Sequence, residues 1–174
     1  MALRCILATT AIAPLIGGQA FGFEAFGFRS GMSPAEVEAA APLGFHVHWF
    51  NSTGIVAADN SPTNIYVTLT VCAGRLVAVI RPVDADSEWL PRMKELLQQR
   101  GQPQVRVSTD AWTGPGGGDI STVELVWRSP GEKVILNLTP EGRDGTGQLR
   151  FTRSASIAYD DVGPLNTCFS PANR

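Results

Sequence analysis

His46 and His48 are the two histidines of the chain, and they stand two positions apart in a stretch typical of a β-strand. Side chains at positions i and i+2 of a strand lie on the same side, so both rings could hold one metal ion or act as an acid–base pair. No third potential ligand stands at a spacing typical of a metal site. Two protein ligands are fewer than the three or four of a usual zinc centre. The pattern also fits two histidines on the solvated face of a strand, so we assign no resident metal or cofactor.

Other familiar catalytic patterns are absent from the sequence. The glycines at 114–118 are followed by neither Lys-Ser/Thr nor a helical pattern, so a phosphate-binding loop is not indicated. No serine stands in a Gly-x-Ser-x-Gly elbow. The sequence therefore favours a binding protein over an enzyme.

Tryptophans supply a second group of candidates, because tryptophan is enriched where proteins bind one another. Trp112 lies beside the glycine-rich loop, and Trp49 follows the histidine pair. Trp127 falls on the apolar side of its strand and is expected in the core. The candidate binding residues are therefore His46, His48, Trp49 and Trp112.

The first twenty residues have the layout of a secretion signal. Arg4 precedes an uncharged stretch from Cys5 to Ile16, and small residues follow, with Gly18 and Ala20 at the positions that signal peptidase requires. The apolar stretch is short of the ~20 residues that a membrane-spanning helix needs. We expect cleavage before Phe21, no membrane span, and a soluble product in the periplasm or the secreted fraction.

Charge and cysteine count agree with export. Without residues 1–20 the chain keeps 13 basic and 16 acidic side chains, a formal charge of −3, with no run of Lys or Arg, so nucleic acid is not an expected partner. Two cysteines remain, Cys72 and Cys168, and an oxidising compartment favours a disulfide between them. Closing so long a loop contributes about 4 kcal/mol in the chain-entropy model. The alternative is two buried free thiols.

Helix and strand signals alternate twice along the chain. Ser33-Pro34-Ala35-Glu36 is a capping box that starts a helix ending near residue 41, and an apolar stripe predicts a second helix over 87–100. Strand patterns follow each helix, at 45–50, 63–72 and 75–81, and then at 104–109, 120–128, 133–139 and 149–159. We therefore expect an α+β fold of two tandem units, each with one helix and a three- to four-stranded antiparallel sheet. The first covers residues 21–82, and the second covers 83–174 with a C-terminal tail.

Two of the later strands alternate between apolar and polar residues, as in an antiparallel sheet with one solvated face. The apolar set is Val123, Leu125, Trp127, Val134, Leu136 and Leu138, and the polar set is Thr122, Glu124, Arg128, Lys133 and Asn137. The helices should cover the apolar face and leave the polar face open. That open face is the expected binding surface.

The stretch at 28–37, Phe-Arg-Ser-Gly-Met-Ser-Pro-Ala-Glu-Val, resembles the Gly-Met-Ser/Thr-x-x-Glu-Val opening of the small outer-membrane lipoproteins that assist barrel assembly. These lipoproteins have one helix followed by three strands. Two such units in tandem resemble the fold of β-lactamase inhibitor protein, whose sheet binds another protein. The resemblance implies a binding module. The lipoproteins carry a lipid-modified cysteine at the mature N-terminus, whereas Phe21 is expected here, so their membrane tether is not transferred.

Two hypotheses follow. The first is an exported protein-interaction module that binds an envelope or secreted protein through its polar sheet face. The alternative is a small-ligand or metal-binding protein, with hydrolase activity as one version, centred on His46 and His48.

Overall fold

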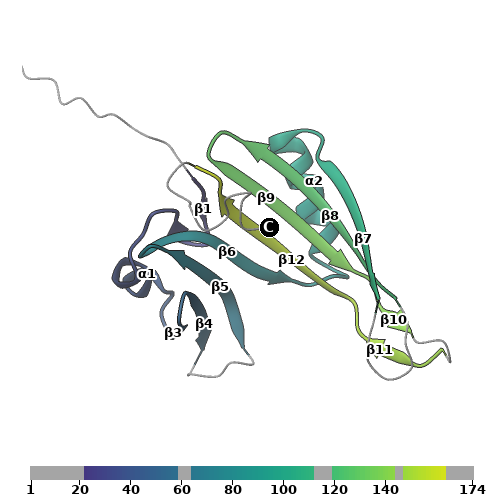
Figure 1. The fold of residues 1–174 in the computed structure, drawn as a ribbon, viewed down its shortest axis with the longest axis horizontal. Helices are drawn as coiled ribbons and strands as arrows, with labels where there is room; N and C mark the ends of the chain where they lie inside the picture. Colours follow the sequence, from purple (N-terminus) through teal and green to yellow (C-terminus); the bar gives the residue numbers. More distant parts are fainter. Residues whose placement is uncertain (1–21, 59–63, 112–118, 144–146, 164–174) are drawn as a thin grey trace, which may run out of the picture.

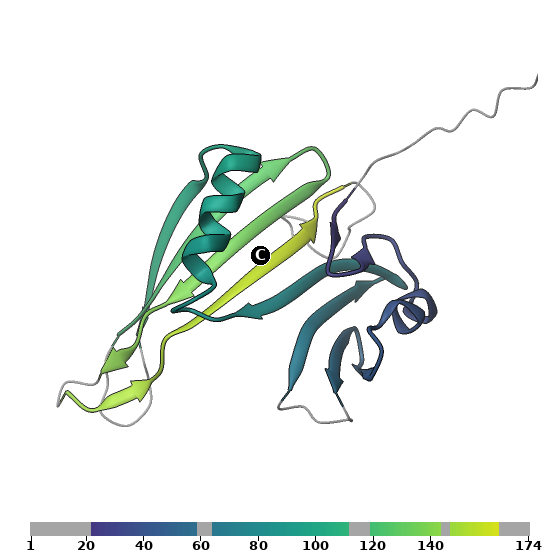
Figure 2. The same cartoon turned by 180° about the vertical axis from the view of Figure 1, so that it is seen from behind.

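The structure is a computed structural model that describes residues 22–58, 64–111, 119–143 and 147–163. Its main element is one eight-stranded antiparallel sheet in the order β3-β4-β5-β6-β12-β9-β8-β7. The strands are β3 (Phe45–Phe50), β4 (Thr53–Ala58), β5 (Ile65–Cys72), β6 (Arg75–Val83), β7 (Gln104–Ala111), β8 (Asp119–Ser129), β9 (Glu132–Thr139) and β12 (Ser154–Asp161). Figure 1 and Figure 2 show the sheet from its two sides, with α2 behind it in the first view and in front of it in the second.

Two short ribbons accompany the sheet. β1 (Glu24–Ala25) pairs with β2 (Phe28–Arg29), and β10 (Gly142–Arg143) pairs with β11 (Leu149–Phe151). Phe23 and Phe28 of the first segment are buried in the core. The N-terminal segment therefore helps to close one end of the molecule.

The two predicted helices are confirmed. α1 (Pro34–Ala40) begins at the capping box, where the backbone N–H of Ser33 donates to Glu36 Oε2 at 2.7 Å. That hydrogen bond, followed by the one from the Ser33 hydroxyl, lowers the pKa of Glu36. α2 (Trp89–Arg100) begins two residues later than the predicted residue 87 and ends at Gly101, whose φ is 74°.

The predicted division into two tandem helix-plus-sheet units is wrong. Strands β6 and β12 pair side by side from Val83↔Ala155 to Ala78↔Asp160, so the sheet runs without a break across its middle. The fold is mostly β, with two helices lying on one large sheet among the described residues. The sequence pattern missed this because pairing between strands so far apart leaves no local signal. It also missed β4, which follows β3 after Asn51 and Ser52 alone.

Both hydrophobic clusters lie on the same face of this sheet. The first cluster includes Val37 of α1 with Val56, Val67, Leu69, Leu76 and Val79, and the second includes Leu96 of α2 with Leu125, Trp127, Val134, Leu136 and Ile157. Cross-strand register places these strand residues on one side. Phe26 and Tyr159 pack against both clusters, so the core is continuous along the helix-covered face.

Trp49 fixes α1 to the first strand of the sheet. Its indole Nε1–H donates to Glu38 Oε1 at 2.8 Å, and its ring lies over Gly54 on β4. A Cβ at position 54 would come within 2.7 Å of Trp49 Cζ3. Glycine at this position is therefore what allows the indole to lie flat on the sheet.

Gly54→Ala is expected to push the indole outward and to lower the free energy of unfolding by about 1–3 kcal/mol. Urea unfolding measures this loss. In a Trp49→Leu background the contact is gone, so the same substitution should cost much less. An equal cost in both backgrounds would contradict the contact.

The continuous sheet predicts one unfolding transition. Leu69→Ala in the first cluster and Leu136→Ala in the second each empty a fully buried site and should lower stability by about 2–5 kcal/mol. Each should shift the same cooperative transition by tryptophan fluorescence and by far-ultraviolet circular dichroism. Leu90→Ala, at a site 47% exposed, is the control and should change little. Two separated transitions would show that the halves unfold independently.

Candidate functional site

The face of the sheet opposite the helices, called the open face below, carries a row of mainly apolar side chains that crosses all eight strands. Each member is the register partner of the next. From one edge to the other the row is His48, Ile55, Thr68, Ile80, Ala158, Ile135, Val126 and Gln104. Ile80, near the middle, keeps 36% of its surface exposed, whereas Ala158 and Val126 of the same row keep 5% and 3%. The row is thus an apolar band on a surface that neither helix covers.

Two further register rows, in which most members are polar, flank this band on its two sides. One row is Phe50, Thr53, Thr70, Ala78, Asp160, Lys133 and Arg128. The other includes Pro82, Ser156, Asn137, Glu124 and Arg106. The open face therefore has an apolar centre and a rim whose charged residues all lie on β12, β9, β8 and β7. An apolar centre with a polar rim is typical of protein interfaces.

The first flanking row contains one shielded ion pair. Lys133 Nζ lies 2.6 Å from Asp160 Oδ2, and the two side chains are 12% and 17% exposed. Both charges are therefore largely shielded from solvent. Arg128, the register partner of Lys133, is exposed.

The polar set predicted from the sequence does lie on the open face. Thr122, Glu124, Arg128, Lys133 and Asn137 share this side, whereas Leu125, Trp127, Val134 and Leu136 are buried on the other. The apolar band was missed because it becomes visible only when strands are aligned. Its one local signal was Val126 and Ile135, two apolar residues at positions where the alternation calls for polar ones.

His46 and His48 lie on the open face of the edge strand β3, opposite Ala57 and Ile55. His46 is exposed and His48 is half-buried, and His48 Nε2 is a buried atom without a hydrogen-bond partner. Within the described residues, no group of three or more His, Cys, Asp or Glu side chains could hold a metal ion. The structure therefore places the pair together without supplying a third ligand.

The other predicted site residues lie elsewhere. Trp49 is on the helix-covered face, bound to Glu38, so it takes no part in the open face. Trp112 and Cys168 lie outside the described residues. Cys72 is buried at the end of β5, and its disulfide with Cys168 stays a prediction.

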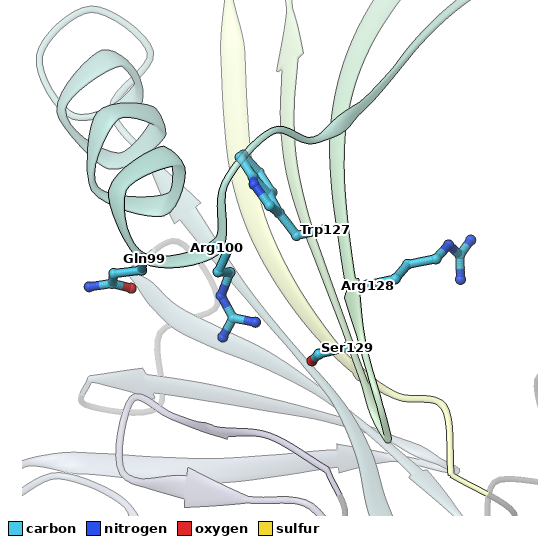
Figure 3. A pocket seen from close by; sticks show the side chains of 5 residues that line it. All are labelled: Gln99, Arg100, Trp127, Arg128 and Ser129. Atoms are coloured by element: carbon cyan, nitrogen blue, oxygen red, sulfur yellow. The ribbon is translucent and has the colours of Figure 1, made fainter.

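A pocket of about 330 Å³ lies near the C-terminal end of α2, lined by Gln99, Arg100, Trp127, Arg128 and Ser129 (Figure 3). Two of its polar groups, on Arg100 and Trp127, already have partners inside the protein. Arg100 Nη1 donates to Glu132 Oε2 at 2.7 Å, and Trp127 Nε1 donates to the Gly101 carbonyl oxygen at 2.8 Å. Figure 3 shows the Arg128 side chain directed away from Arg100. These bonds hold the end of α2 against the sheet, so we assign the pocket a structural role.

Tyr159 is the described core residue with a perturbed pKa. Burial raises the pKa of its hydroxyl, and the positive charges of Arg92 and Arg100 partly oppose that rise. Phe26 and Phe23 pack against its ring on the helix-covered face. A phenol kept protonated in this way fits a core residue rather than a base.

No helix in the described ranges has the length and apolar character needed to cross a membrane. Comparisons with protein-family models, with curated proteins and with solved structures found no match to this chain.

Proposed function

We propose that this protein is an exported interaction module that binds another protein through the open face of its sheet. The observation that carries the proposal is the apolar band across eight strands, which both helices leave uncovered. Interfaces typically combine an apolar centre with a polar rim. The secretion signal expected at residues 1–20 favours an envelope or secreted partner, and the resemblance of residues 28–37 to binding modules favours the same class of activity.

The charges of the open face indicate what the partner should present. Lys133 is held by Asp160, whereas no ion pair is observed for the exposed Arg128 among the described residues. A carboxylate of the partner opposite Arg128 would complete this end of the rim. Apolar partner side chains would contact Ile80 and Ile135, the two isoleucines nearest the centre of the band.

Site-specific photocrosslinking tests which face is bound. A photoreactive amino acid at Ile80 or at Arg128 should give a crosslink to one and the same envelope or secreted protein. The matched control is Lys94, which is exposed on α2 on the opposite side of the sheet. Crosslinks from Lys94 but not from Ile80 or Arg128 would reject the open face as the binding surface.

Affinity measurements with the captured partner test the chemistry. Ile80→Asp and Arg128→Glu should each weaken binding by at least about tenfold, since each removes a favourable contact and adds an unmatched charge. Lys94→Glu makes the same charge reversal as Arg128→Glu and should leave the affinity unchanged. Equal affinity for all three variants would contradict the proposed chemistry.

A metal or small-ligand site at the histidine pair is the second candidate. The unpartnered Nε2 of His48 is the observation that favours it, because a neutral imidazole nitrogen is a common metal ligand. Zinc and copper titrations should then show saturable binding that is lost in the His46→Ala/His48→Ala variant. Identical titration curves for the two proteins would reject a metal site at His46 and His48 without affecting the open-face proposal.

A further inference from the structure

Strand β7 forms one outer edge of the sheet, and nothing among the described residues covers it. All eight of its residues, Gln104–Ala111, are exposed, including Val105 at 59% and Val107 at 68%. At the opposite edge four of the six residues of β3 are at least partly buried. The exposed valines are the register partners of Leu125 and Val123, so the apolar side of the sheet continues to this edge without a cover.

An edge strand presents unpaired backbone N–H and C=O groups that can pair with another strand. Proteins commonly block such edges with lysine, proline or a bulge. Strand β7 contains neither lysine nor proline, and its register with β8 is regular over all eight pairs. Nothing in the part of the chain that the structure describes therefore blocks pairing along its length.

The sequence of β7 is complementary to itself. If two copies pair antiparallel with Ser108 on the two-fold axis, Arg106 of each copy stands opposite Asp110 of the other. On the helix side, the same register places Val107 opposite Thr109 and Val105 opposite Ala111, with the two Val107 side chains as diagonal neighbours. One register thus matches charges on the open face and brings the exposed valines of the two copies together on the other face.

The charges on this strand also lack strong pairing within one chain. Asp110 faces Ile120 of β8, and no ion pair is observed for it among the described residues. Arg106 stands opposite Glu124, and its guanidinium makes a long hydrogen bond of 3.5 Å to Gln104. In the paired arrangement each Arg106 would lie between Glu124 of its own chain and Asp110 of the second copy.

We propose that a second copy of this chain pairs along β7, so that two eight-stranded sheets join into one continuous sheet. The contact is isologous, because the same strand serves both copies. The proposal rests on the β7 edge alone and is independent of what the open face binds.

Charge reversal followed by mixing tests the register. Arg106→Asp alone would place two carboxylates opposite each other at both ends of the contact, and Asp110→Arg alone would place two guanidinium groups there. Each variant should therefore raise the dimer dissociation constant by more than about tenfold. Mixing the two variants restores an opposite-charge pair at both positions. The mixture should form a heterodimer with an affinity near that of the unaltered protein, as measured by analytical ultracentrifugation.

Arg29→Asp is the matched control, because it makes the same charge change as Arg106→Asp on β2, in the ribbon that closes the other half of the core. It should leave the dimer dissociation constant unchanged. Circular dichroism is used to check that each variant is folded. A monomeric unaltered protein, a dimer insensitive to both reversals, or a mixture that fails to associate would each overturn the proposal.

Discussion

The pairing of β6 with β12 is the interaction on which the rest of the structure depends. It brings β6, from the first half of the described chain, beside β12, the strand that comes last in the sequence. Both hydrophobic clusters pack on the sheet that results. Without it β6 and β12 would each become an edge, and the core around Tyr159 would open. The same pairing places Ile80 beside Ala158, so the apolar band crosses the molecule only because these two strands meet.

Local features of the fold could be predicted because their causes are local. The capping box at Ser33 and Glu36 starts α1, and the apolar stripe ending at Gly101 defines α2. Ala73 and Gly74, both with positive φ, turn β5 into β6 as the hairpin pattern indicated. In each case a few neighbouring residues contain the whole signal.

The rest could not be predicted because it depends on which strands become neighbours. The alternation within β8 and β9 assigned their two faces correctly, but it could not show that Ile135 and Ile80 flank the same alanine. The i, i+2 spacing correctly predicts that His46 and His48 share one side of their strand, whereas nothing local shows that Trp49 bonds to Glu38 of α1 and lies over Gly54 of β4. A candidate site built from register is thus accessible only once the sheet order is known.

The central position of β12 has a consequence for biogenesis. Residues 154–161 are synthesised after both of their partner strands, and until they arrive β6 and β9 have no partner on one side. Contacts between segments this distant in sequence form slowly, and a nascent chain that lacks one of them cannot complete its core. The topology therefore delays completion of the fold until β12 has been made. A chain that is still unfolded can pass through a narrow channel, as the proposed export would require.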